Sequence, residues 1–515
     1  MSNTWTDGYQ TEVNYTYGYY KDLSPNYQKF CLLLNGVDSP SSNEQHFHCE
    51  LGFGQGVSLN IHAASNLGQF IGTDFNPAHA GHASMLAEHS QIPHQFYDAS
   101  FEELLNKDLP MLDSISLHGI WSWISHENQH IILKSIRKYL KPNGIVYISY
   151  NCVTGWAANI PIRELFHSHF KFNSVSNNPI QKVKDSLAFS EALLQQNPNF
   201  AKRNPNAISK VQDLQKQNPN YLIHEYLNQD WQCFSFQQVA RILEEAKLTY
   251  ACSTDLNTQL NSINFSEEHQ QFLNKIEHPI LREQCRDYFA NTQFRKDLFI
   301  RGKNNLSPLE IQTRLRNTAF VLLIAPEHLP KTITGYLGEF NLIQDIYEPL
   351  GKLFKQENYA PQTIADIEKK LLDQSYAKIL NALVILCHLG FAQPCQAEVS
   401  QETLQHAHQL NRFILEQASF HNNYQVLACP ISGIGINADQ FTQLFYRAHF
   451  IDGLKTAKQF AEYAQQVLND LGWFIIDKGE TITDKATSLT LLQEKAQLFL
   501  EQDKIKIAKQ LKLFA

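Results

Sequence analysis

The sequence predicts a doubly wound, mainly parallel α/β sheet that is followed by mainly helical domains. Short apolar segments alternate with amphipathic segments from about residue 46 to 150, and a glycine-rich turn follows the first apolar segment. From about residue 260 onward the patterns are mainly helical. Strands separated by helices of this length pair in parallel, because a parallel crossover needs at least a helix's length of chain.

The first five strands and their helices follow one another without interruption. We expect strands at 46–50, 69–74, 94–97, 112–117 and 144–150, with helices at 77–89, 100–105 and 128–140 among them. In the last of these helices Ile132, Ile136 and Leu140 recur at a spacing of four, and the residues up to Gly144 form a stop signal. The first strand is polar for a central strand, so we expect one of its faces to meet solvent or the insert described next.

The alternation breaks between about residues 165 and 222. This region is rich in Asn, Gln and Lys, and it carries Asn-Pro-Asn three times, at 197–199, 204–206 and 218–220. Proline disfavours helix at the residue before it, so these tripeptides separate short helices, and we expect a helical insert here. Two further strands are then expected, at 231–234 and 248–252.

Composition and charge exclude several classes of protein. The 43 basic and 51 acidic residues give a net charge of −8, whereas a dedicated duplex-binding protein needs a basic footprint. Nine dispersed cysteines without a C-x-x-C pair indicate reduced thiols. No apolar run approaches the roughly 20 residues that span a bilayer, and the first ten residues lack a secretory pattern. We therefore expect a cytoplasmic protein of several domains without membrane insertion.

A glycine turn after the first strand is the strongest local signal. Gly52, Gly54 and Gly56 follow Glu50 in the pattern E-x-G-x-G-x-G. Glycines let the backbone turn tightly and approach a ligand closely. The dinucleotide pattern G-x-G-x-x-G is not met, because position 57 is a valine.

Two carboxylates end the next two predicted strands. Asp74 lies 22 residues after Gly52 and could accept hydrogen bonds from both hydroxyls of a ribose. Asp98 could accept from an adenine amino group, with Ala99 leaving room for the ring. Each carboxylate could instead cap the helix that follows it. Because the carboxyl ends of parallel strands share one edge of a sheet, these groups are expected where doubly wound folds bind ligands.

No metal site is expected. The sequence lacks H-E-x-x-H, the phosphate-binding G-x-x-x-x-G-K-[ST] and the nucleophile motif G-x-S-x-G. His79 and His82 lie three residues apart on a predicted helix, but no third ligand follows at a suitable spacing. We interpret them as solvated helix residues.

These segments resemble the class I S-adenosylmethionine-dependent methyltransferases. The resemblance rests on ELGFGQG at 50–56, GTDFNP at 72–77, DAS at 98–100 and LKPNG at 140–144. A closer resemblance over most of the chain rests on segments 17–25, 121–125, 150–156 and 287–295. It is to the branch that combines this fold with a methyltransferase regulatory domain and includes rickettsial protein-lysine methyltransferases that modify outer-membrane protein B.

The resemblance implies a seven-stranded Rossmann-like methyltransferase sheet that takes S-adenosyl-L-methionine and releases S-adenosyl-L-homocysteine. The glycines would pass beneath the methionyl part, and Glu50 would fix the turn or reach the amino group through water. Aromatic side chains would favour the cationic sulfonium or ammonium. The implied cofactor-binding residues are Tyr17, Glu50, Gly52, Gly54, Gly56, Asp74, Phe75, Asn76, Asp98, Ala99 and His118. The implied catalytic residues are Tyr20, His118 and Trp121.

The expected organisation follows from the same patterns and the resemblance. It comprises a cofactor-lid segment at 1–45, the methyltransferase domain at 46–165 and 222–260, the insert at 166–221, a helical regulatory or middle domain at 261–330, a helical, winged-helix-like middle domain at 331–398 and a C-terminal domain at 399–515.

The expected activity is N-methylation of lysine side chains in a protein such as an outer-membrane or surface protein. This predicts an open acidic or aromatic groove, a protein partner with accessible lysines, no nucleic-acid partner and, from the resemblance, a homodimer. One alternative is methylation of a small metabolite or RNA, which predicts a closed pocket or a basic rim. The other is an inactive cofactor-binding interaction protein, in which a side chain of the insert plugs the site.

Overall fold

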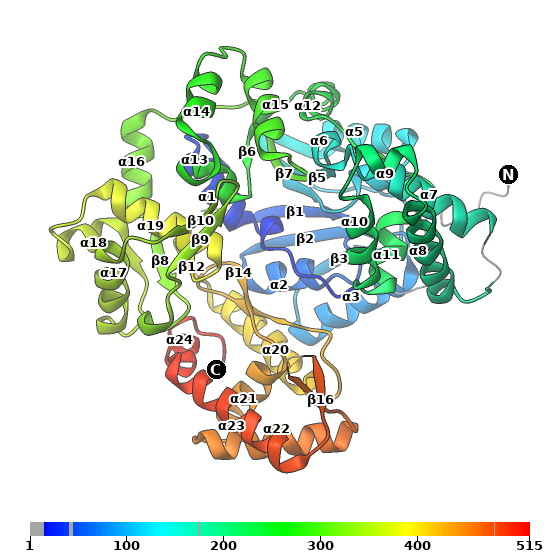
Figure 1. Ribbon diagram of the computed structural model, residues 1–515. Helices are drawn as coiled ribbons and strands as arrows, with labels where there is room; N and C mark the ends of the chain where they lie inside the picture. The colour runs from blue at the N-terminus through cyan, green and yellow to red at the C-terminus, as the bar shows by residue number, and fades with distance from the viewer. Residues whose placement is uncertain (1–14, 41–44, 174–175, 478) are drawn as a thin grey trace.

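A seven-stranded sheet forms the centre of the protein in a computed structural model, which describes residues 15–40, 45–173, 176–477 and 479–515 (Figure 1). The strand order is β3-β2-β1-β4-β5-β7-β6. Strands β1 to β5 pair in parallel, whereas β7 runs antiparallel to both β5 and β6. The strands are β1 His46–Leu51, β2 Gly68–Thr73, β3 His94–Tyr97, β4 Leu112–Leu117, β5 Leu140–Asn151, β6 Leu248–Ser253 and β7 Phe294–Arg301. The predicted fold class is confirmed.

The seventh strand is not the predicted one. Segment 231–234 makes only an isolated bridge between Phe234 and Cys152, and β7 enters the sheet between β5 and β6 instead. β7 therefore belongs to the sheet and not to a separate domain beginning at residue 261. Its sequence, FRKDLFIR, has a charged first half that is untypical of a central strand. Those charges become compatible with burial because Arg295 pairs with neighbouring acids.

The polar first strand meets neither solvent nor the insert through its histidines. His46 and His48 are both buried, and each places a ring nitrogen within 2.8 Å of the Ser114 hydroxyl on β4. Burial lowers the pKa of His48 to about 3, so its ring stays neutral. One hydroxyl can serve two neutral rings, because it donates to one nitrogen and accepts from the other.

Helices cover both faces of the sheet. On one face α4 (Phe101–Leu105), α5 (His126–Tyr139) and α12 (Phe236–Glu244) share a core with the strands. On the other face α1 (Pro25–Leu34), α2 (Val57–Ser65) and α3 (Pro77–Ser90) join a second core, which continues into the C-terminal regions. The central sheet is thus packed, through its helices, against the rest of the chain.

The insert forms its own helical layer beside the sheet (Figure 1). It consists of α7 Ile160–Phe172, α8 Pro179–Gln195, α9 Asn199–Arg203, α10 Ala207–Gln215 and α11 Pro219–Tyr226. Its core is built around Phe166, Val183 and Val211, together with Trp156 from the chain that enters it. The helices therefore extend beyond the predicted limits of 166 and 221 at both ends.

Helices and small sheets make up the remaining chain. The first group is α13 Asn261–Asn264, α14 Glu267–Asn274, α15 Pro279–Ala290 and α16 Pro308–Asn317. The helices of the middle region are α17 Gln344–Gln356, α18 Ile364–Lys370 and α19 Tyr376–Leu389. Its three-stranded sheet consists of β8 Ala319–Leu322, β11 Gln362–Thr363 and β12 Ala392–Pro394. A separate hairpin consists of β9 Thr332–Gly335 and β10 Gly338–Asn341. Because β8 pairs with β11 and β12, the predicted boundary at 330 divides this sheet.

The C-terminal region packs on the second face of the sheet. It contains α20 Gln401–Gln417, the hairpin of β13 Val426–Cys429 and β14 Ile434–Asn437, α21 Gln440–Phe450, α22 Ala457–Leu471, the hairpin of β15 Ile475–Asp477 and β16 Glu480–Ile482, α23 Lys485–Glu501 and α24 Lys504–Gln510. Helix α20 packs on α2 and α3. None of the helices in the described parts is long and apolar enough to cross a membrane.

The segment before α1 joins the sheet to the C-terminal region. The Ser24 hydroxyl donates to the Gly433 carbonyl at 2.8 Å, and the Tyr19 hydroxyl accepts from the Gly435 amide at 2.5 Å. Residues 1–14 and 41–44 of the predicted lid segment lie outside the described residues. The described part of that segment therefore connects the sheet to the C-terminal region.

We expect Arg295→Met to lower the free energy of unfolding by about 3–5 kcal/mol, because it leaves buried acids without their cation. Arg295 lies 2.7 Å from Asp297 and 2.8 Å from both Asp287 and Glu283, and its side chain is 6% exposed. Thermal and urea unfolding would measure the change. The control is Arg314→Met, which breaks an exposed pair with Asp38 and should cost under about 1 kcal/mol. Equal losses in the two variants would contradict the structural role of the cluster.

Candidate functional site

The glycine turn between β1 and α2 adopts a backbone that only glycine takes readily. Gly52, Gly54 and Gly56 have φ values of +72°, +56° and +70°. A Cβ on Gly56 would lie 2.4 Å from the Cβ of Ala83 on α3, so the third glycine also allows two helices to pack. The pattern E-x-G-x-G-x-G thus encodes left-handed conformations at three alternate positions.

Asp74 is held against this turn by three hydrogen bonds. Its Oδ2 accepts from the Gly54 amide at 2.8 Å, and its Oδ1 lies 3.0 Å from the Asn76 amide and 3.1 Å from Nδ1 of His79. A carboxylate has about four acceptor sites, so capacity remains for a hydroxyl of a ligand. The end of β2 is thereby fixed to the end of β1.

Glu50 provides an unpaired buried acceptor below the turn. Its Oε2 has no hydrogen-bond partner among the described residues. Burial, and secondarily the charge of Asp74, raises the pKa of Glu50 to about 8. A cationic group brought to this position would favour the ionised carboxylate.

A cavity of about 410 Å³ opens at the carboxyl edge of the sheet, above the turn. Six of the residues singled out from the sequence line it: Gly52, Gly54, Asp74, Phe75, Ala99 and His118. The remaining lining residues are Tyr15, His79, Ser100, Phe101, Glu102, Gly119, Ile120, Trp123, Ile124, Ser125, Glu127, Asn128, Ile131 and Asp230. The wall thus combines a polar glycine side with an aromatic and aliphatic side, as ligand pockets usually do.

His118 forms the floor of the aromatic side. Its Nδ1 lies 2.8 Å from the Tyr147 hydroxyl, and its ring lies 3.8 Å from the ring of Tyr20. Burial lowers the pKa of His118 to about 4. The imidazole is therefore neutral at physiological pH and can offer a lone pair, although it is a weak base.

Comparisons with known proteins agree with this geometry. A family model described as a methyltransferase domain matches residues 49–148, and one described as a predicted methyltransferase regulatory domain matches residues 218–301. The uncharacterized protein sll1526 of Synechocystis is 35% identical over 503 residues, which are 96% of this chain and 97% of that protein. The structure of PKMT2 from Rickettsia typhi in complex with AdoHcy has the same fold, with a TM-score of 0.69 and 18% identity over 96% of this chain and 99% of that one.

The chain belongs to the S-adenosylmethionine-dependent methyltransferases that carry a methyltransferase regulatory domain. The regulatory segment of this methyltransferase is part of its catalytic sheet, because residues 218–301 include both β6 and β7. The same segment contributes Asp230 to the cavity.

Two aromatic residues of the methyltransferase lie away from their predicted positions. Trp121 is completely buried in the core below β4, whereas Trp123 lines the cavity. Both belong to a 3-10 turn, whose successive residues point about 120° apart, so residues two apart face different directions. Tyr17 packs its ring against those of His82 and Tyr424 and lines a different cavity.

Other predicted cofactor residues support the site from outside its lining. Asn76 caps α3 by accepting from the Ala78 amide. Asp98 is exposed, Glu50 is buried at the end of β1 before the turn, and Gly56 ends the turn; in the described structure none of Asn76, Asp98, Glu50 and Gly56 lines the cavity. The catalytic candidate Tyr20 reaches the cavity through its stacking on His118.

The two histidines of α3 are not freely solvated, contrary to the expectation: His79 is buried and His82 is half-buried. His79 is buried against Asp74, and His82 lies 2.6 Å from the Gln55 carbonyl and 2.8 Å from the Tyr424 hydroxyl. Their positions three residues apart on the face of α3 toward the turn could have indicated this role. Across the described ranges no group of three potential ligands could hold a metal ion.

Sequence reasoning missed Glu225, a half-buried acid of the insert next to the aromatic wall. The indole N–H of Trp123 donates to the Glu225 carbonyl at 3.2 Å. Desolvation raises the pKa of the Glu225 carboxyl to about 8, an effect that Asn151 partly offsets. The pKa of Tyr20 is raised mainly by burial and secondarily by the charge of Glu225. No ion pair joins Glu225 to a cation within the described residues. Only the placement of α11 beside β5 brings Glu225 to this position, so no local sequence signal marks it.

We expect the stability gained by Glu225→Gln to depend on pH. The folded protein keeps the Glu225 proton up to about pH 8, whereas the unfolded chain releases it near pH 4.5. Wild-type stability therefore falls through this window, and the advantage of the variant should grow from pH 4.5 to 8 and stay constant above it. Thermal unfolding at half-unit pH intervals measures this advantage.

The matched control for this pH dependence is Glu480→Gln, at an exposed position on β16. Its stability relative to wild type should follow no such rise. A Glu225→Gln advantage that is the same at pH 5 and pH 8 would contradict burial of an ionisable carboxyl.

Proposed function

We propose that the protein transfers a methyl group from S-adenosyl-L-methionine to lysine side chains of a protein, such as an outer-membrane or surface protein. The observation that carries the donor assignment is the cavity in which Asp74 is bound to the Gly54 amide. The AdoHcy complex of the similar PKMT2 supports it.

The residues present fit this donor. Asp74 offers the ribose hydroxyls its remaining acceptor sites, and Ala99 and Phe101 line the cavity where an adenine would lie. The unpaired Oε2 of Glu50 suits the ammonium group of the methionyl part, directly or through water. The bound donor supplies an activated methyl group on a sulfonium.

The aromatic side of the cavity suits an amine acceptor. A lysine side chain has an ordinary pKa near 10.4 and must lose a proton before it can form the new C–N bond. The rings of Tyr15 and Trp123 exclude water, and burial beside a positive sulfonium lowers an amine pKa. Tyr20 and His118, stacked at 3.8 Å, orient the acceptor from below.

The position of Glu225 favours an amine as the methyl acceptor. An ammonium group that reaches the Tyr20 side of the cavity would favour the ionised form of the Glu225 carboxyl, whose proton would go to solvent, and would be held by it. One ammonium proton would then pass to this carboxylate or to the lone pair of His118, which would leave the neutral amine that the donor can methylate. The main contribution of the site is positioning and desolvation, because the donor is already activated.

Asp74→Asn is expected to weaken S-adenosyl-L-homocysteine binding by about 10–100-fold, because a charged hydrogen bond to the ribose is lost. Isothermal titration calorimetry measures the dissociation constant. Asp108→Asn, at an exposed position before β4, is the control and should bind as wild type does. Unchanged affinity in Asp74→Asn, with unchanged thermal stability, would show that the donor lies elsewhere.

Methyl-labelled donor, incubated with the protein and a fraction of bacterial membrane proteins, is expected to label lysine. Acid hydrolysis and mass spectrometry identify the methylated residue. Glu225→Gln should reduce the rate of labelling by about tenfold or more while leaving S-adenosyl-L-homocysteine binding within twofold of wild type. Label confined to an RNA or small-metabolite fraction would refute the lysine assignment.

A further inference from the structure

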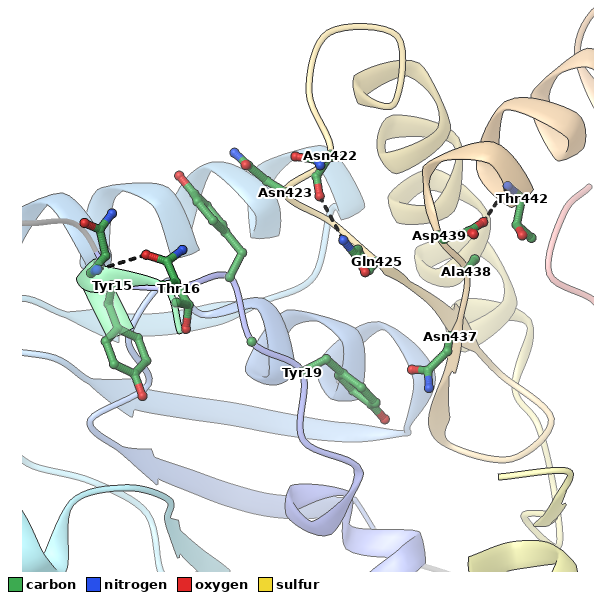
Figure 2. A pocket seen from close by; sticks show the side chains of 14 residues that line it. Tyr15, Thr16, Tyr19, Asn422, Asn423, Gln425, Asn437, Ala438, Asp439 and Thr442 are labelled. Atoms are coloured by element: carbon green, nitrogen blue, oxygen red, sulfur yellow. Dashed lines mark hydrogen bonds between the residues drawn. The ribbon is translucent and has the colours of Figure 1, made fainter. Parts of the chain in front are cut away.

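A second cavity, of about 880 Å³, lies between three segments that are far apart in the sequence. The described part of the N-terminal segment, the start of α11 and the β13–β14 hairpin region with the start of α21 form its walls, as Figure 2 shows. Its lining residues are Tyr15, Thr16, Tyr17, Gly18, Tyr19, Asn218, Asn220, Asn422, Asn423, Gln425, Asn437, Ala438, Asp439 and Thr442. We call this cavity the carboxamide groove.

Carboxamide side chains are the largest group among the residues that line the carboxamide groove. Five asparagines and one glutamine line it, and no lysine or arginine is among its described lining residues. Each carboxamide offers a donor and an acceptor, which matches the N–H and C=O groups of a peptide backbone. Asp439 is its one charged lining residue in the described structure, and its carboxylate already accepts from the Thr442 amide at 2.8 Å.

Several of these carboxamides are available to a ligand. The side chains of Asn422 and Asn437 are exposed and make no hydrogen bond within the described residues. In Figure 2 they lie on the C-terminal side of the groove, across from Tyr15, whereas Tyr19 reaches toward the strand that carries Asn437. The walls therefore present unsatisfied donors and acceptors from one side and aromatic rings from the other.

The carboxamide groove and the methyl-transfer cavity share a lining residue. Tyr15 lines both cavities, and its ring contacts that of His224 at 5.1 Å. Asn220 lies near the start of α11 and Glu225 near its end, so about 7.5 Å of helix separates the two positions. One helix thus borders the groove at one end and the acceptor side of the site at the other.

We propose that the carboxamide groove binds an extended segment of the acceptor polypeptide through its main chain, with the target lysine reaching past Tyr15 toward the methyl-transfer site. This inference rests on the proposed function and specifies where its substrate lies. Recognition of the main chain accepts many flanking sequences, because every residue presents the same amide groups. An RNA strand is disfavoured here, because its phosphates require lysine or arginine.

The test compares two acceptors on the full-length protein. One is Nα-acetyl-lysine methylamide, and the other is a 13-residue peptide with a central lysine flanked by serine and glycine. Wild type should methylate the peptide with a kcat/KM at least about tenfold higher, because only the peptide reaches the groove. The double variant Asn422→Ala/Asn437→Ala should lose about tenfold on the peptide and stay within twofold on the blocked lysine.

The matched control is Asn469→Ala, which removes an exposed carboxamide from α22, outside the groove. It should behave as wild type on both acceptors. A peptide that is no better than the blocked lysine, or a double variant as active on the peptide as wild type, would overturn the proposal.

If the proposed function is wrong, the two acceptors give a different result. Neither acceptor would then be methylated, although S-adenosyl-L-homocysteine still binds. In that event the groove is tested by fluorescence anisotropy of the labelled peptide, with the product bound. Affinity about tenfold lower in the double variant supports the groove, whereas equal affinity, or binding of a labelled oligouridine in place of the peptide, overturns it.

Discussion

The hydrogen bond from the Gly54 amide to Asp74 is the constraint on which the rest of the site depends. It joins the ends of β1 and β2, and it exists only because three glycines hold left-handed backbone conformations between β1 and α2. Turning the amide toward the carboxylate opens the space above Gly52 and Gly54 that becomes the cavity. His79 then holds the other oxygen of the same carboxylate, so the group enters the cavity already oriented. Preorganisation of this kind lowers the cost of binding.

The segment that matches the regulatory-domain model is a structural part of the methyltransferase sheet. Residues 218–301 complete the catalytic sheet with β6 and β7, and the Arg295 cluster fixes β7 to α15. Burial raises the pKa of Asp287 to about 6 even beside this arginine, which shows how strongly the cluster is desolvated. A movement of α15 would therefore also move β7. Strand β7 pairs with β5, whose last residue, Asn151, lies on the acceptor side of the site.

The sequence predicted those features of the fold and of the site that depend on local patterns. The five parallel strands, the glycine turn and the acids at two strand ends were found because spacing alone places them at one edge of a sheet. The strand β7 could not be found this way, because its charged residues look exposed until their partners are known: Arg295 pairs with Asp287 of α15, and Asp297 pairs with Arg295 itself. Trp121 and Trp123 were confused because a single 3-10 turn decides which ring faces the cavity. Glu225 and the carboxamide groove depend on contacts between segments that are far apart in the sequence, which no local pattern records.

The N-terminal segment connects the methyl-transfer cavity to the C-terminal regions. Tyr19 is bound to the Gly435 amide, Ser24 to the Gly433 carbonyl and Lys21 to the Cys387 carbonyl, so residues 19–24 are fastened to parts of the chain beyond the sheet. Tyr20, within this short segment, stacks on His118 at the floor of the cavity. The position of that ring is therefore set by the C-terminal hairpin and α19 as much as by the sheet. Because the hairpin also lines the carboxamide groove, one contact can couple occupation of the groove to the geometry of the acceptor site.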